Sequence, residues 1–181
     1  GRVALPSPIL STVLLAGRAI LAGGSEAQKQ GLLPKIAAGE VLLSFALTEA
    51  SARPDAATVR TRARAVGDGH VLNGTKHFVE FAEQAGQMLV VARTSESANP
   101  GQGLTMFLVD ARAPGIEYIP LQTLALQPQA KVVLKDVRVA ATGVVGRVDH
   151  AWAVLDPVIQ AATAIVCAYM TGIAEGAHEL A

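Results

Sequence analysis

Cysteine, net charge and aromatic residues are all scarce in this 181-residue chain, and the first two shortages exclude whole classes of protein. The lone cysteine, Cys167, excludes an intrachain disulfide framework and any multi-cysteine metal site. Because Cys167 falls in an apolar helical pattern, we expect it to be buried and inert. The formal net charge is zero, from 15 basic and 15 acidic residues. This balance gives no electrostatic reason to expect a nucleic-acid partner.

Familiar signatures of catalytic and phosphate-binding sites are also missing. The four histidines have no metal-ligand spacing, so no metal site is expected. Residues 99–103 (NPGQG) lack the lysine and the following helix of a phosphate-binding loop. No nucleophile elbow supports a Ser-His-Asp triad. Glu49, Asp55 and Glu80 are acids near predicted strand ends, and whether two of them form a glycosidase pair depends on their separation in space.

No secretory or membrane-spanning segment is evident. The apolar stretch 8–23 is interrupted by Arg18 and is too short to cross a bilayer. We therefore expect a cytoplasmic protein without a membrane span. The first residue is not Met, and the last helical pattern has no C-cap, so we also expect a piece of a longer protein.

What the chain has in abundance is small and branched apolar residues: 51% of it is hydrophobic and only 4% aromatic. Residues 9–22 predict a helix that is apolar around most of its circumference and needs partners on several sides. A second helix is expected over 26–38, with Ser25 and Gln28 forming a capping box. Pro34 is expected to kink or split this helix, and Gly39 to end it.

The pattern changes to β-structure after residue 40. Strands are expected over 41–47, 58–65, 70–72, 75–81, 88–93, 104–109, 116–121 and 131–139. Asp68-Gly69 and Asn73-Gly74 each signal a hairpin turn. In 58–65, Val59, Thr61, Ala63 and Ala65 point one way, and three arginines point the other way into solvent.

The fold class that follows is α+β, with a central antiparallel β-barrel or sandwich flanked by helices of two incomplete helical domains. We place the domains at 1–39, 40–148 and 149–181. The last helix begins either at Asp156-Pro157 or near Ala151 with a kink at the proline.

The order of these motifs resembles the acyl-CoA dehydrogenase family. Residues 46–55 (ALTEASARPD) are similar to that family's ALTEPGAGSD signature, and residues 72–76 (LNGTK) to its LNGxK segment. Residues 24–40, 89–94, 107–109 and 136–139 match further parts of the family pattern. The resemblance covers nearly the whole chain.

The resemblance implies an FAD-dependent enzyme that oxidises an acyl-CoA thioester between Cα and Cβ, with hydride passing to flavin N5. It implies an electron-transfer flavoprotein as redox partner and a homo- or hetero-oligomer. The catalytic base of the family lies beyond the end of this chain, so no catalytic residue is expected here. The implied cofactor-binding residues are Phe45, Leu47, Thr48, Pro54, Phe78, Val79 and Glu80, and the implied substrate-binding residues are Ala52, Arg53 and Pro54.

Two departures from the family pattern leave an alternative open. The loop 50–54 (ASARP) loses two glycines and a serine, and Arg53 could either clash with a pyrophosphate or neutralise one. Glu80 stands where a hydroxyl usually reaches N5, and it can donate a hydrogen bond only when protonated, which needs a raised pKa. A non-catalytic subunit of the same fold, with a degenerate flavin site, is the alternative function.

Overall fold

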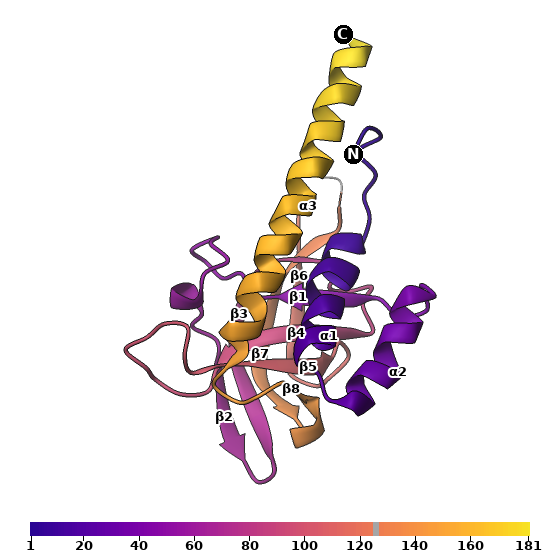
Figure 1. Ribbon diagram of the computed structural model, residues 1–181. Helices are drawn as coiled ribbons and strands as arrows, with labels where there is room; N and C mark the ends of the chain where they lie inside the picture. Colours follow the sequence, from indigo (N-terminus) through magenta and orange to yellow (C-terminus); the bar gives the residue numbers. More distant parts are fainter. Residues whose placement is uncertain (125–126) are drawn as a thin grey trace.

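The chain folds into one open β-sheet with helices packed on one side of its centre (Figure 1). The computed structural model describes residues 1–124 and 127–181. The strands are β1 (Leu43–Ala46), β2 (Arg62–Val66), β3 (Gly69–Glu80), β4 (Gln87–Arg93), β5 (Leu104–Asp110), β6 (Ile116–Leu121), β7 (Gln129–Val139) and β8 (Val144–Val145). The helices are a π-helical segment (Ile9–Gly17), α1 (Arg18–Gly23), α2 (Glu26–Ala37) and α3 (Ala151–Leu180), with short 3-10 turns at Ala56–Thr58 and Ala141–Gly143.

Strand β4 lies at the centre of the sheet and is buried on both faces. Its odd and even residues belong to different hydrophobic clusters: Met88 and Val90 pack in one, Leu89 and Val91 in the other. The second cluster includes residues of α1 and α3, so the helices cover that face. This double burial explains why the strand is a continuous apolar run without alternation.

The α+β class is confirmed. Of the expected antiparallel barrel or sandwich, the closed barrel is wrong, and the pairing is not antiparallel throughout. The described strands form an open path, β6-β7-β3-β2-β4-β5-β8, with β1 attached to β4. The pairings of β1 and of β2 with β4 are parallel. Both end strands are poor pairing partners, since β6 contains Pro120 and β8 has only two residues.

One of the two predicted hairpin turns is a strand irregularity instead. The turn before Gly69 connects β2 and β3 as expected. At Asn73-Gly74, however, β3 runs straight on, with a shift of its register against β7. Asn73 exchanges hydrogen bonds with the backbone and carboxylate of Asp136. A Cβ on Gly74 would lie 2.5 Å from the Thr61 hydroxyl, so close approach explains this glycine.

The predicted capping box of the second helix is confirmed. Ser25 accepts a hydrogen bond from the Gln28 amide, and the Gln28 side chain accepts one from the Ser25 amide. Helix α2 continues past Pro34 to Ala37, so the proline does not split it. Gly39 follows with φ of +73°.

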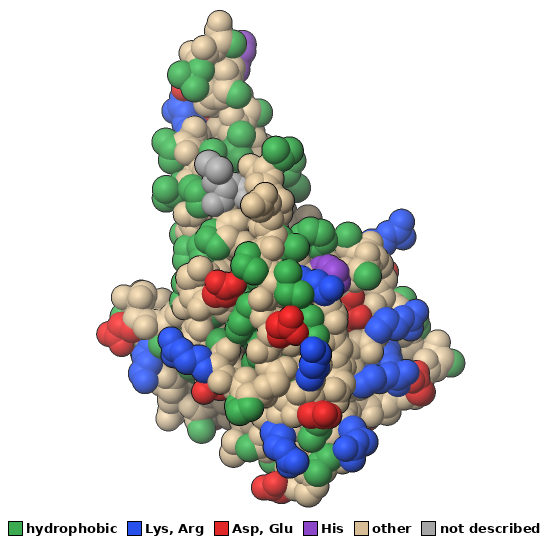
Figure 2. Space-filling view, turned by 180° about the vertical axis from the view of Figure 1, so that it is seen from behind, with side chains coloured by type: hydrophobic (Ala, Val, Ile, Leu, Met, Phe, Trp, Pro, Cys, Tyr) green, Lys and Arg blue, Asp and Glu red, His purple; other side chains and the backbone are tan. Residues whose placement is uncertain are grey.

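Helix α3 begins at Ala151, in line with the second of the two predicted starts, and runs through Pro157. Its C-terminal half projects beyond the sheet, with the N-terminal segment and residues Leu124 and Gln127 of the β6–β7 connection beside it (Figure 1). The expectation that Cys167 is buried is therefore wrong, because this residue lies on the projecting half and is exposed. Figure 2 shows apolar side chains along the projection, while charged side chains of both signs cover the body.

The expected absence of a membrane span remains a prediction. Among the described residues, α3 is long and apolar enough to cross a membrane by length and composition, with a mean hydropathy of 1.6 and 22% of that stretch buried. Core helices of soluble proteins have the same character, so this is weak evidence.

Thr12 joins the π-helical segment to β1. Among the described strands, β1 pairs with β4 alone. On its other edge the buried Thr12 hydroxyl donates to the Leu43 carbonyl at 2.7 Å and accepts from the Leu43 amide at 3.2 Å. A side chain therefore takes the place of a further strand at this edge.

We predict that Thr12→Val lowers the free energy of unfolding by about 1–3 kcal/mol, because it leaves two buried backbone groups of Leu43 without a partner. Urea unfolding measures this change. Thr171→Val is the matched control: Thr171 is exposed and bonds only to Cys167 in its own helix, so its loss is expected to cost less than about 0.5 kcal/mol. Equal losses in the two variants would contradict the role given to Thr12.

Candidate functional site at the end of strand β1

A buried ion pair fixes the backbone where β1 ends. The Lys76 ammonium on β3 lies 2.7 Å from Oε1 of Glu49, just beyond β1, and both side chains are almost completely inaccessible to solvent. Lys76 also donates to the Leu47 carbonyl at 3.1 Å. The Thr48 carbonyl between them accepts from the His77 amide at 2.9 Å. Three consecutive residues of the ALTE stretch are thus tied to β3.

Glu49 has further donors on the segment that leads into β2. Its carboxylate accepts from the Arg60 amide at 2.8 Å and from both the amide and the hydroxyl of Thr61 at 2.9 and 2.8 Å. Burial alone would raise the pKa of Glu49, but the Lys76 ammonium and the hydrogen bonds lower it overall. Burial lowers the pKa of Lys76 to about 8, with Glu49 opposing the shift, so both groups are charged at neutral pH.

An extra residue in β3 sets the direction of the side chains that follow Lys76. The register against β7 shifts between Lys76 and Val79, and Phe78 has a φ of +55°. Val79 consequently enters the core, with 1% of its surface exposed. Phe78 and Glu80 instead face a cavity on the helix side of the strand.

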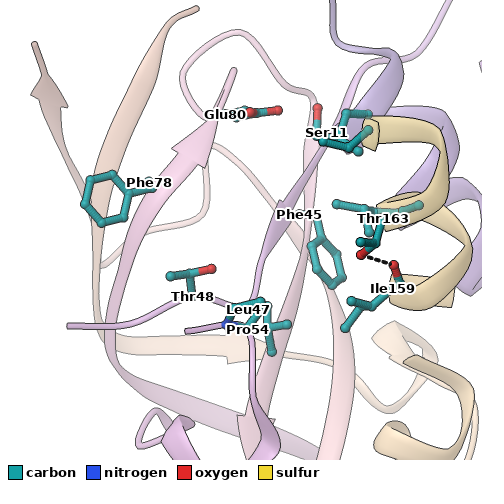
Figure 3. A pocket seen from close by; sticks show the side chains of 13 residues that line it. Ser11, Phe45, Leu47, Thr48, Pro54, Phe78, Glu80, Ile159 and Thr163 are labelled. Atoms are coloured by element: carbon teal, nitrogen blue, oxygen red, sulfur yellow. Dashed lines mark hydrogen bonds between the residues drawn. The ribbon is translucent and has the colours of Figure 1, made fainter. Parts of the chain in front are cut away.

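The cavity has a volume of about 260 Å³ and lies between the ends of β1 and β3 and the first half of α3 (Figure 3). Its walls come from the π-helical segment, β1, the loop after β1, β3 and α3. They consist of Leu10, Ser11, Leu15, Phe45, Leu47, Thr48, Pro54, Phe78, Glu80, Ile159, Ala162, Thr163 and Val166. An apolar pocket with few polar groups is the usual form of a small-molecule site.

Two polar side chains in this cavity have no hydrogen-bond partner among the described residues. These are the Thr48 hydroxyl and the Glu80 carboxyl, which reach from the β1–β3 side toward α3 (Figure 3). The other hydroxyls are engaged: Ser11 donates to the Pro8 carbonyl and Thr163 to the Ile159 carbonyl. Burial raises the pKa of Glu80. Thr48 and Glu80 are therefore the groups available to a ligand.

Most of the residues expected to bind a cofactor come together here. Phe45, Leu47, Thr48, Pro54, Phe78 and Glu80 all line the cavity. Val79 does not, because its side chain is in the core. Ala52 and Arg53 are exposed on the loop outside the cavity. Glu49 and Asp55, two of the acids noted in the sequence, are engaged elsewhere, Glu49 with Lys76 and Asp55 capping the Ala57 amide.

Sequence reasoning missed the helical half of the cavity. Ser11 and Leu15 come from the π-helical segment, and Ile159 and Thr163 come from α3. The one signal was that the 9–22 helix is apolar on most sides and must have several partners. The buried state of Lys76 was missed as well, since lysine is rarely found in a core.

We predict that removing either partner of the buried pair strongly destabilises the fold, and that the losses from Glu49 and Lys76 are not additive. Lys76→Met and Glu49→Gln should each lower the free energy of unfolding by about 3–5 kcal/mol. Glu49→Gln should cause the larger loss of unfolding free energy. It leaves the buried Lys76 ammonium without its carboxylate and with the Leu47 carbonyl as its remaining uncompromised acceptor. In Lys76→Met, by contrast, the Glu49 carboxylate keeps three donors, from Arg60 and Thr61. The double variant should cost less than the two single variants together.

Lys135→Met is the control for this cycle. It removes the exposed ion pair of Lys135 with Glu117 between β7 and β6, which is expected to contribute no more than about 1 kcal/mol. Additive losses for Glu49 and Lys76, or a loss as small as that of Lys135→Met, would contradict the buried pairing.

The lowered pKa of Glu49 predicts a specific acid sensitivity. Since this pKa is lower in the folded chain than its ordinary 4.5, the stabilisation is complete above pH 4.5 and is lost as the pH falls through the folded value. Unfolding free energies measured against pH should therefore fall less steeply below pH 4.5 in Glu49→Gln than in the wild type. Glu175→Gln, at an exposed position of α3, should keep the wild-type slope.

Comparison with known proteins agrees with the architecture around the cavity. The family model described as the acyl-CoA dehydrogenase middle domain matches residues 44–137, which include β1 and the buried pair. An acyl-CoA dehydrogenase of Mycobacterium bovis, FadE12, is 34% identical over 82% of this chain and 40% of its own length.

Two solved structures share the fold over most of the chain. Butyryl-CoA dehydrogenase from Megasphaera elsdenii has a TM-score of 0.87 and 29% identity, covering 94% of this chain and 45% of its own. The ChsE4–ChsE5 complex from Mycobacterium tuberculosis gives a TM-score of 0.77 and 30% identity, covering 86% of this chain and 40% of that chain. The chain thus spans less than half the length of the relatives it matches. On the family match and these likenesses together, the chain belongs to the acyl-CoA dehydrogenase family.

Proposed function

We propose that the cavity at the end of β1 receives the ring system of FAD, and that the protein containing this chain is an acyl-CoA dehydrogenase. The observation that carries the proposal is the pair of unpartnered polar groups, Thr48 and Glu80, in an otherwise apolar cavity of a family whose members are flavoproteins. The reaction is the oxidation of an acyl-CoA thioester between Cα and Cβ.

The residues present fit a flat, mostly apolar ring with polar edges. A volume of about 260 Å³ is just below the usual range for ligand sites, roughly 300–1,000 Å³, so it suits a ring system better than a whole dinucleotide. Phe45 and Leu47 offer flat and apolar walls, and Phe78 offers an aromatic ring at the rim, where 47% of its surface is exposed. Thr48 supplies a hydroxyl that can donate or accept.

Each side chain then has a definite task. Thr48 orients the polar edge of the ring, and Phe78 packs against its face. The helical walls from α3 exclude water, which strengthens the polar contacts made inside. FAD, when bound, supplies the hydride acceptor. The family's carboxylate base is expected outside these 181 residues, and Ala52, Arg53 and Pro54 are proposed to meet the thioester arm.

The domain boundaries are part of the same proposal. Residues 1–39 are the end of an N-terminal helical domain, 40–148 a central β domain and 149–181 the first helix of a C-terminal bundle. We further propose a cytoplasmic location, an electron-transfer flavoprotein as redox partner and an oligomeric state, to which the likeness to the ChsE4–ChsE5 complex lends support.

A second function, a non-catalytic subunit of the same fold, is favoured by one feature of the structure. The loop 51–55 is exposed and places the charged Arg53 where the family signature has a glycine. Such a loop is compatible with a contact to a partner subunit as well as with a cofactor pyrophosphate.

The deciding experiment is an anaerobic absorbance spectrum of the full-length protein before and after adding a mixture of acyl-CoAs. We expect a flavin band that bleaches on addition. A protein without flavin, or with flavin that never bleaches, would contradict the dehydrogenase and favour the subunit.

Thr48 can be tested within the same cavity against a second threonine. Thr48→Val should weaken FAD binding about tenfold, because it removes one hydrogen bond to the ring. Thr163→Val should leave binding unchanged, since the Thr163 hydroxyl is bonded to the Ile159 carbonyl at 2.8 Å (Figure 3). Equal effects in a fluorescence-quenching titration would contradict the role of Thr48.

A further inference from the structure

Glu80 is the one residue with an ionisable side chain among the thirteen that line the cavity at the end of β1. Its carboxyl has no hydrogen-bond partner among the described residues, although the residue is half-buried at the cavity wall. A carboxylate in such a place is costly unless it is paired or protonated. The charge state of this residue therefore decides what the cavity can bind.

The backbone holds Glu80 in this position from two sides. The register shift between Lys76 and Val79 turns Val79 into the core and Glu80 toward the cavity. The buried Ser44 hydroxyl on β1 donates to the Glu80 carbonyl at 2.9 Å, which fixes the end of β3 against β1. The carboxyl is thus placed by the fold, and no ligand is needed to bring it there.

Among the residues that the structure describes, no charged side chain faces Glu80 from the surrounding elements. The cavity residues from the π-helical segment, β1 and α3 are all uncharged. On β7 its register partner is Gln129, with Lys131 two residues further on. On its own strand Lys76 is engaged with Glu49, and His77 lies three residues before Glu80, within the register shift. Glu83 lies beyond the end of β3 and is exposed.

We propose, resting on the proposed flavin site, that Glu80 is a proton-controlled hydrogen-bond donor: protonated, it donates its O–H to the ring in the cavity, and ionised, it weakens binding of that ring. The protonated acid offers a donor to a ring nitrogen or carbonyl oxygen, whereas the carboxylate offers acceptors alone. Burial raises the pKa of Glu80, which brings this change closer to neutral pH. The cavity therefore favours an oxidised, acceptor-rich ring at the lower end of the pH range.

The test follows FAD binding to the apo form of the full-length protein by fluorescence quenching, from about pH 4, below the ordinary pKa of a glutamate, to about pH 8. We expect wild-type affinity to fall about tenfold across the titration of Glu80, the equivalent of one hydrogen bond. Glu80→Gln, whose amide donates at every pH, should bind without this dependence. Glu83→Gln is the matched control and should retain the wild-type profile.

Two further measurements separate an effect of Glu80 on the ring from other sources of pH-dependent binding. Riboflavin, which has the ring but no phosphate, should show the same pH dependence as FAD if the ring is the part that senses Glu80. Without any ligand, the carboxyl carbon of Glu80, assigned in NMR spectra by its loss in Glu80→Gln, should titrate above the ordinary 4.5.

The outcomes distinguish the two proposals. A pH dependence that persists in Glu80→Gln, or an NMR midpoint at or below 4.5, would overturn the donor role and leave the flavin site standing. Failure of every variant to bind FAD or riboflavin would overturn the flavin site and, with it, the donor role.

Discussion

The ion pair between Glu49 and Lys76 is the interaction on which the site depends. It joins the end of β1 to the middle of β3, and through Arg60 and Thr61 it also holds the segment that leads into β2. Burying both charges is unfavourable, and the arrangement is tolerated because Glu49 accepts four hydrogen bonds and Lys76 has a second acceptor at Leu47. The energetic consequence is that neither partner can be removed alone without leaving a buried charge. The structural consequence is that Thr48 is fixed between two anchored residues.

The cavity is the product of that anchoring and of the register shift in β3. The first presents Thr48 and the second presents Phe78 and Glu80, while the helices supply the apolar wall. Membership of the acyl-CoA dehydrogenase family is the reason for proposing a flavin ring as the ligand of this cavity. Glu80 is the reason for proposing that binding of the ring depends on pH. A family hydroxyl can donate at any ordinary pH, whereas a carboxyl donates only while it holds its proton. Glu80 in place of the family's hydroxyl was one reason to consider a degenerate flavin site. The same residue could instead make a functional flavin site sensitive to pH.

The sequence predicted what depends on local pattern and missed what depends on contacts between distant residues. The Ser25 capping box and the turn before Gly69 are local and were correct. Asn73-Gly74 carries the same local signal as a hairpin, but here the glycine is required by the close approach of Thr61, which no local pattern records. The exposure of Cys167 depends on how far α3 extends past the sheet, which a helical pattern does not contain. The family resemblance supplied six cavity residues, yet the reason why ALTE and LNGTK occur together, the Glu49–Lys76 pair, emerged only from the fold.

The most direct test of this dependence is amide hydrogen exchange in Lys76→Met, measured residue by residue under conditions where the variant is folded. We predict faster exchange at the His77 amide, which bonds to the Thr48 carbonyl, and at the Thr61 amide, which bonds to Glu49. Amides at the β6–β7 edge, such as that of Lys135, which donates to the Gly115 carbonyl at 2.8 Å, should keep their wild-type protection. Unchanged protection at His77 and Thr61, or an equal rise throughout the sheet, would contradict the claim that the ion pair holds the site in place.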